Sequence, residues 1–146
     1  MATVKSILEN KGHSVFALPP QASILDALKL MAEKEIGAVL VMEGETVKGI
    51  FSERDYARRG TLVGNPVTTP LKDVMTQRIF YVSPEQSAET CMAQMSDKHI
   101  RHLPVLKDNK VVGVISVGDI VKSVLKDKDA TIQGLENFIL GQELQQ

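Results

Sequence analysis

Two short segments of the sequence carry a serine and an aspartate at the same spacing. Ser52 precedes Asp55 by three residues, and Ser116 precedes Asp119 by three residues. Serine followed by an acid at this distance is common at a helix start, where each side chain caps a backbone amide. The same groups can hold a ligand, because a carboxylate can accept hydrogen bonds from both hydroxyls of a ribose and the free amides suit a phosphate. An isolated pair of this kind favours capping over binding.

Both segments belong to a longer internal repeat. Residues 49–55 (GIFSERD) recur 64 residues later as residues 113–119 (GVISVGD), and the match extends back without a gap to Phe16 and Phe80. A fixed offset of this kind indicates one supersecondary unit used twice, with each copy burying its core against its neighbour. The chain is therefore predicted to form one module of two related lobes.

Each copy is predicted to contain an extended segment, a helix, two strands and a closing helix. Ser23 and Ser87 stand where the N-caps of the first helices are expected, and Asp26 completes a capping box in the first copy. Helical spacing of apolar residues places Cys91 on a buried helix face. The order β-α-β-β-α, twice, predicts an α+β (mixed α/β) fold. The expected strands are residues 15–18, 38–42 and 47–51 in the first copy and residues 79–82, 103–106 and 111–115 in the second.

The repeat suggests a division of the chain into four parts. Residues 1–60 form the first repeat with an N-terminal helix, residues 61–70 a linker rich in glycine and proline, and residues 71–126 the second repeat. Residues 127–146 form a helical tail in which Ile132, Leu135 and Ile139 share one face. Such a face needs a surface to bury against, either its own module or a second copy.

Composition excludes several classes of function. The 146 residues are 43% hydrophobic and 24% charged with a formal net charge of −1, as in a soluble globular protein without the basic face that nucleic acids require. No signal segment and no apolar run long enough for a membrane span are present, so a cytoplasmic protein without membrane contact is expected. A single cysteine excludes an internal disulfide.

Metal and catalytic chemistry are also not expected. His99 and His102 lack cysteine or carboxylate companions at metal-ligand spacing. The chain offers no nucleophile–base pair, no P-loop and no Gly-x-Gly-x-x-Gly, so no enzyme activity and no catalytic cofactor are predicted.

The repeat resembles the CBS domain pair, the tandem module named after cystathionine β-synthase. The resemblance covers about residues 4–126 and is carried by the doubled Gly-h-h-Ser-x-x-Asp, by residues 102–105 (HLPV) and by the element order. It implies a pseudo-two-fold pair of the stand-alone bacterial type, with two clefts between the repeats. It further implies a regulatory module that binds AMP, ADP or ATP, or alternatively NAD or S-adenosylmethionine, that forms a homodimer and that acts on an unidentified effector protein. Because the Ser-x-x-Asp element occurs twice and resembles that of the CBS family, ligand binding is favoured over helix capping as its role.

The resemblance also implies that each cleft joins the Ser-x-x-Asp element of one repeat to the segment before the inner strand of the other. Asp55 and Asp119 would then hold a ribose, with Ser52 and Ser116 near phosphate. The ligand-binding residues expected in the first cleft are Ser52, Arg54, Asp55, Arg101, His102, Leu103 and Pro104, and those in the second are Ile36, Gly37, Ala38, Val39, Ser116 and Asp119.

The two expected clefts differ in charge. Arginine pairs phosphate in a bidentate manner, so the first cleft, with two arginines and a histidine, suits AMP, ADP or ATP. The second cleft is expected to be small-sided, uncharged and roomy, and could take a second nucleotide, the remainder of a dinucleotide or an adenosyl ligand with less phosphate. Arg54 and Arg101 could instead be solvated charges or partners of Glu53 and Asp97. A structural dimerisation module without a physiological nucleotide remains the alternative function.

Overall fold

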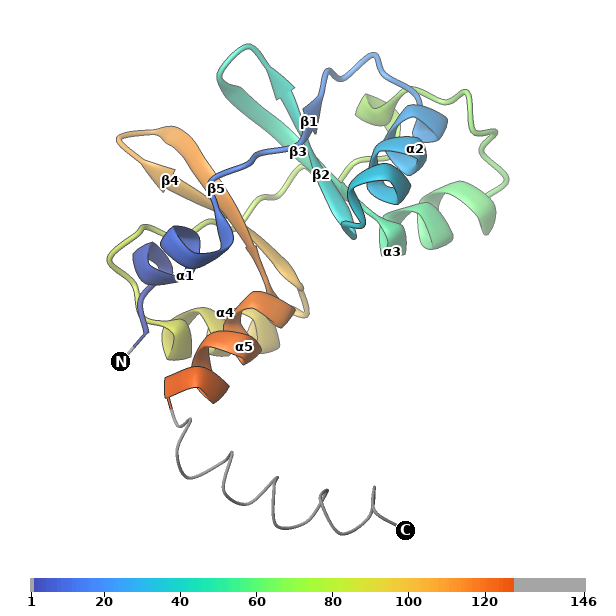
Figure 1. Cartoon of the computed structure of the whole chain (residues 1–146). Helices are drawn as coiled ribbons and strands as arrows, with labels where there is room; N and C mark the ends of the chain where they lie inside the picture. Colours follow the sequence, from blue (N-terminus) through green and yellow to red (C-terminus); the bar gives the residue numbers. More distant parts are fainter. Residues whose placement is uncertain (1, 128–146) are drawn as a thin grey trace, which may run out of the picture.

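The computed structural model describes residues 2–127 as two lobes joined side by side (Figure 1). The helices are capped much as the sequence predicts: Ser23 and Asp26 form a reciprocal capping box at the start of one helix, and Ser87 accepts the amide of Thr90 at another. The first lobe contains β1 (Ala17–Leu18), α2 (Ile24–Lys34), β2 (Ala38–Glu43), β3 (Thr46–Ser52), α3 (Glu53–Asp55) and the π-helix η1 (Tyr56–Thr61). The second contains α4 (Ala88–Lys98), β4 (His102–Lys107), β5 (Lys110–Ser116) and α5 (Val117–Asp127).

The sheets confirm the mixed α and β architecture. β1 runs parallel to β2, and β2 pairs antiparallel with β3, whereas the second sheet consists of the antiparallel pair β4 and β5. The extended segment predicted at residues 79–82 forms only a single parallel bridge, Val82 to Val105. The helix η1 runs through Thr61, which is the first residue of the expected linker, residues 61–70. The tail containing Ile132, Leu135 and Ile139 lies outside the described residues.

The two lobes exchange their leading helices. The N-terminal helix α1 (Val4–Lys11) packs beside β5 and α5 of the second lobe (Figure 1). Leu71 of the 3-10 helix η2 (Leu71–Asp73), and Val74 directly after it, instead pack into the core of the first lobe, which also contains Phe51. The packing units therefore do not coincide with the expected sequence parts 1–60 and 71–126, and each lobe depends on a segment from the other repeat.

This exchange explains the glycines that begin the repeated element. A Cβ atom on Gly113 would lie 2.7 Å from Cδ2 of Leu8, and one on Gly49 would lie 2.5 Å from Sδ of Met75. Close packing leaves no space for such an atom. The glycines thus permit the exchanged segments to lie directly on the strands.

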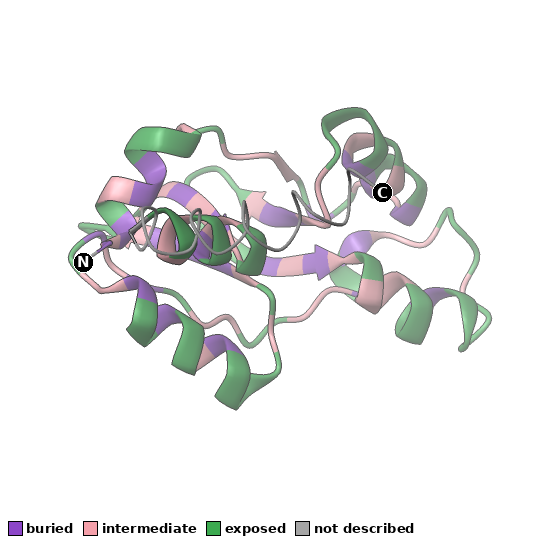
Figure 2. Cartoon of the chain, turned by 60° about the horizontal axis from the view of Figure 1, so that its bottom comes forward, coloured by how far each residue is buried: buried purple, intermediate pink, exposed green. Residues whose placement is uncertain are grey.

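Buried side chains lie along the strands and on the inner helix faces of both lobes (Figure 2). Cys91 is among them, and burial raises the pKa of its thiol. No helix within residues 2–127 is both long and apolar enough to cross a membrane.

Candidate functional site

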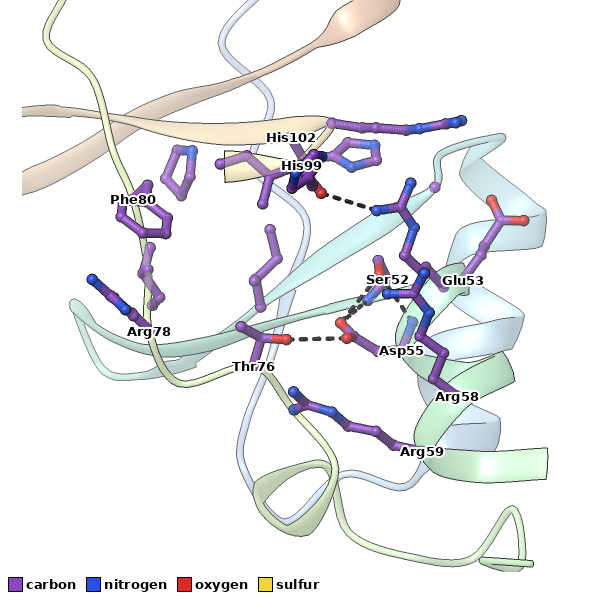
Figure 3. A pocket seen from close by; sticks show the side chains of 17 residues that line it. Ser52, Glu53, Asp55, Arg58, Arg59, Thr76, Arg78, Phe80, His99 and His102 are labelled. Atoms are coloured by element: carbon purple, nitrogen blue, oxygen red, sulfur yellow. Dashed lines mark hydrogen bonds between the residues drawn. The ribbon is translucent and has the colours of Figure 1, made fainter. Parts of the chain in front are cut away.

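Asp55 is fixed at the floor of a cavity between the lobes. The main-chain amide and the hydroxyl of Ser52 both donate to Asp55 Oδ2, at 2.9 and 3.1 Å, and the hydroxyl of Thr76 donates to Oδ1 at 3.0 Å (Figure 3). Ser52 ends β3 and Asp55 closes the turn of α3, so the capping box expected from the sequence sets the position of the carboxylate. The partners of the carboxylate in these contacts are an amide and two hydroxyls, and none of them carries a charge.

This first cavity, of about 390 Å³, is rich in arginine. Five arginines face two carboxylates, Glu53 and Asp55, which is an excess of three positive charges before the histidines His99 and His102 are considered. Such a concentration of like charge favours an anion in the cavity. The arginines are Arg54, Arg58, Arg59, Arg78 and Arg101.

The contacts of these arginines leave their charge uncompensated. Arg54 Nη1 donates to the main-chain O of His99 at 2.9 Å, and Arg59 Nη1 donates to the main-chain O of Met75 at 2.8 Å. Within residues 2–127, none of the five forms an ion pair with a carboxylate. Arg54 and Arg101 therefore do not form the alternative ion pairs with Glu53 and Asp97 within residues 2–127. Asp97 pairs with Lys98 instead, at 3.5 Å.

The structure brings most of the expected first-cleft residues together. Ser52, Asp55 and both expected arginines line the cavity, as do His102 and Pro104 from the start of β4. Leu103 does not: it is fully buried in the core of the second lobe. The difference follows from strand alternation, which turns every second side chain of β4 away from the cavity.

Sequence reasoning missed the residues that reach the cavity from outside the two expected segments. Arg58 and Arg59 come from η1, while Thr76, Arg78 and Phe80 come from the stretch between η2 and α4 and lie across the cavity from Arg58 (Figure 3). Arg58 could have been found, because a residue three positions after Asp55 lies on the same helix face. Thr76 and Arg78 carried no such signal, since their position depends on the path of the connecting segment.

A second cavity, of about 440 Å³, also lies between the two lobes. We call the boundary between the lobes, where Gly37, Ile50 and His102 line both cavities, the seam. All six residues expected in the second cleft line it: Ile36, Gly37, Ala38, Val39, Ser116 and Asp119. The expectation of an uncharged cleft is wrong, because Lys11, Glu35 and His102 line it as well. Lys11 arrives from the exchanged helix α1, which the sequence had assigned to the other lobe.

Asp119 is held differently from Asp55. Its Oδ2 accepts the Ser116 amide at 2.8 Å and lies 2.6 Å from the ammonium of Lys11. Burial alone would raise the pKa of Asp119, but the hydrogen bonds from Lys11 and Ser116 outweigh it and hold the pKa below its ordinary value. The carboxylate of the second cavity is therefore ionised and already paired.

His102 forms part of the wall between the two cavities. It lines both of them, together with Gly37 and Ile50. Burial lowers the pKa of His102, and the positive charges of Lys11, Arg101 and Arg54 lower it further, against the opposing influence of Asp119. The neutral imidazole is thus surrounded by groups from both clefts.

Comparison with known proteins agrees with this arrangement. The CBS domain family model matches residues 4–60 and 71–126. The CBS domain-containing protein CBSX3, mitochondrial, of Arabidopsis thaliana is 32% identical over 149 residues, which covers 95% of this chain and 72% of the relative. 

Solved structures share the fold. One of them is named as a signal-transduction protein with CBS domains from Burkholderia ambifaria MC40-6. It is 43% identical to this chain, with a TM-score of 0.84, and the match covers 88% of this chain and 97% of the Burkholderia chain. The CBS domain pair of protein MJ0100, in complex with 5′-methylthioadenosine and S-adenosyl-L-methionine, is 22% identical with a TM-score of 0.76 and covers 87% and 98%. The repeated Ser-x-x-Asp elements, the paired lobes and the family match at both repeats show that this chain belongs to the CBS domain family, as a tandem pair.

Proposed function

We propose that the protein is a regulatory module that binds an adenine nucleotide in the first cavity and has no catalytic role. The observation that carries the proposal is the combination, in one cavity, of a fixed carboxylate at Asp55 and an excess of arginines that form no ion pair with a carboxylate of the described part of the chain. A carboxylate suits the two hydroxyls of a ribose, and guanidinium groups suit phosphate.

The described contacts support this division of roles. The Ser52 and Thr76 hydroxyls bound to Asp55 can turn away when ligand hydroxyls arrive, and no charge is left unpaired by the exchange. Arg58 and Arg101 lie in the same cavity and can reach a phosphate attached to such a sugar. The complex of MJ0100 with two adenosyl compounds supports the adenosyl part of the ligand.

AMP, ADP and ATP fit the positive excess best, and NAD or S-adenosylmethionine are the alternatives. Regulation requires that the nucleotide bind two conformations with different affinity. The seam between the lobes is where such a difference can arise, because the first cavity draws residues from both repeats.

Isothermal titration calorimetry with AMP, ATP, NAD and S-adenosylmethionine tests the proposal. We expect saturable binding of a phosphate-bearing ligand and its loss, by at least about tenfold, in Asp55→Asn, since a charge-assisted contact contributes more than about 1.4 kcal/mol. Asp26→Asn is the matched control, because Asp26 forms the same capping box at α2 away from both cavities. Absence of binding by every ligand, or equal losses in the two variants, would overturn the proposal.

A second candidate function, self-association, has its own observation. α5 carries an exposed apolar row at helical spacing: Val117 is 38% exposed, Val121 42% and Leu125 45%. Contiguous exposed apolar side chains indicate an interaction surface. A homodimer formed through this face is compatible with nucleotide binding, and without a nucleotide it would make the chain a structural dimerisation module.

Light scattering of Val121→Asp tests this surface. We expect a dimer to dissociate, while Lys122→Asp on an adjacent exposed position leaves it intact. Unchanged mass in both variants would remove α5 from the interface. An intact dimer that responds to none of the nucleotides would instead favour the structural module.

A further inference from the structure

Lys11 reaches into the second cavity from the end of α1. Its Nζ lies 2.6 Å from Oδ2 of Asp119 and donates a further hydrogen bond, of 2.7 Å, to the main-chain O of Val114. Asp119 is the residue that corresponds to Asp55 in the repeat. The ammonium therefore occupies the position at which a ligand sugar would meet this carboxylate.

The backbone that carries Lys11 is fixed. Val4 and Leu8 of α1 are buried in the core of the second lobe, and the amide of Gly12 closes the helix by donating to the O of Leu8 at 2.7 Å. The Lys11 side chain itself is 35% exposed. The ammonium can therefore move away from Asp119 by side-chain rotation while α1 stays in place.

Among residues 2–127, no such ion pair is formed in the first cavity. The apolar residues Val4, Ile7 and Leu8 of the first leading segment recur 67 residues later as Leu71, Val74 and Met75. At this offset, the residue equivalent to Lys11 is Arg78. Its guanidinium lies over the ring of Phe80, 5.3 Å from the centroid, and Asp55 accepts the neutral hydroxyl of Thr76 instead. The two cavities thus hold equivalent carboxylates in different electrostatic states.

Because of this difference, an entering ligand displaces a different group from the carboxylate in each cavity. Ligand hydroxyls can replace the Thr76 hydroxyl at Asp55 with no change in charge pairing. At Asp119 they replace an ammonium ion, and breaking a partly buried ion pair leaves the displaced charge without a partner. An anionic group on the ligand would provide that partner.

We propose that Lys11 determines the ligand class of the second cavity: it excludes neutral nucleosides and admits nucleosides that carry an anionic group. The inference rests on the proposed function, because it assigns to Asp119 the sugar contact proposed for Asp55. Lys11 first shields Asp119 and then binds the phosphate or carboxylate of the ligand. The same side chain would weaken one class of ligand and strengthen the other.

The test compares adenosine with AMP in a protein whose first cavity is silenced by Asp55→Asn. Affinities are measured by isothermal titration calorimetry with and without Lys11→Met, which keeps the apolar stem but removes the charge. We expect AMP to bind at least about tenfold more tightly than adenosine when Lys11 is present. In Lys11→Met, adenosine should gain affinity and AMP should lose it, so that the ratio falls close to one. Lys5→Met, at an exposed position on the same helix, is the matched control and should leave the ratio unchanged.

Three outcomes overturn the inference. They are an unchanged ratio in Lys11→Met, a loss of affinity for both ligands, and a Lys11→Met protein in which the second cavity still binds neither. If the protein with intact Asp55 binds AMP while any of these is found, only the inference fails. If that protein binds no nucleotide either, the proposed function fails with it.

Discussion

His102 of the second repeat lies against Gly37 of the first, with ring atoms Cε1 and Nε2 each 3.3 Å from the position that a Cβ atom on Gly37 would take. Both residues line both cavities. The same Cβ position is 3.2 Å from Oε1 of Glu53. The seam between the clefts therefore depends on the absence of a side chain at Gly37.

Gly37→Ala is expected to weaken ligand binding in both cavities, because the new methyl group would displace His102 and Glu53 by a few tenths of an ångström. We also expect a loss of stability of about 1 kcal/mol from the crowding. Calorimetric titration and chemical denaturation measure the two effects. Gly118→Ala is the control, since a Cβ there has its nearest neighbour, Oγ of Ser116, at an ordinary 3.7 Å. Equal affinities in Gly37→Ala and the parent would show that the seam does not constrain the clefts.

His102 is expected to take up a proton when a phosphate-bearing ligand binds. Burial, Lys11, Arg101 and Arg54 hold the pKa of His102 below its ordinary value, against the pull of Asp119, and an anion beside the ring favours the charged form. Titration with AMP near pH 6 in two buffers of different ionisation enthalpy measures the uptake. His102→Gln should abolish it and His99→Gln should retain it; uptake that persists in His102→Gln would assign the proton to another group.

The same histidine should affect stability in acid. Because its pKa is lowered in the folded state, the unfolded chain binds more protons between the folded pKa and the ordinary value near 6.5. The contribution to stability is therefore complete above pH 6.5 and is lost as the pH falls through the folded pKa. Unfolding curves of His102→Gln should depend less on pH in this window than those of the parent. An identical pH dependence would contradict the assignment.

The contact between Leu8 and Gly113 should appear as coupling in a double-mutant cycle. Gly113→Ala inserts a methyl group 2.7 Å from Leu8 Cδ2 and should destabilise the fold by about 1–3 kcal/mol. With Leu8→Ala already present, the added methyl group finds space and its cost should fall by more than about 0.5 kcal/mol. Denaturant unfolding of the four proteins provides the free energies. Strict additivity would mean that the exchanged helix does not press on β5 in solution.

Lys11→Met should raise the pKa of Asp119, because it removes the hydrogen bond and the positive charge that oppose burial. Carbon-13 NMR titration of the side-chain carboxyls measures the shift, with Lys5→Met as the control. Since Asp119 has a lowered folded-state pKa, the ion pair stabilises the fold above the ordinary value of 3.8 and this contribution is lost as the pH falls. The pair is partly exposed, so its loss at neutral pH should cost no more than about 1 kcal/mol. An unmoved pKa would exclude the pair in solution.

Arg101→Ala should weaken the binding of AMP more than the binding of adenosine, because the proposed partner of Arg101 is the phosphate.

Asp55→Ala should weaken nucleotide binding more than Asp119→Ala does, since the first cavity holds the greater positive charge. Calorimetric titration of the three variants with both ligands gives the ranking. An equal loss of AMP and adenosine in Arg101→Ala would remove its phosphate role, and equal losses in the two aspartate variants would show that the cavities are ranked wrongly.

The sequence by itself determined the local structure and the pairing of the repeats. Helix caps at Ser23 and Ser87 depend on neighbouring residues, and so do the turns and the alternation of strands, which is why they could be read from spacing. The fixed offset of 64 residues predicted one module of two similar lobes. How the clefts combine the two repeats was implied by the resemblance to the CBS domain pair, and on that basis Ser52, Asp55 and His102 were expected in one cavity and Gly37 and Asp119 in another.

Only the tertiary structure decided which segments complete the cavities. The exchange of α1 and η2 between the lobes brings Lys11 to Asp119, a contact across 108 positions of the chain, and it brings Thr76 to Asp55. Local spacing carries no information on such an exchange, because the two leading segments have similar apolar faces and either one could pack against either core. Similarly, packing decides which face of β4 meets the core: Leu103 is buried in the second lobe, and His102 faces the two cavities. The electrostatic difference between the clefts thus arises from tertiary packing, and it could not be predicted from the sequence repeat alone.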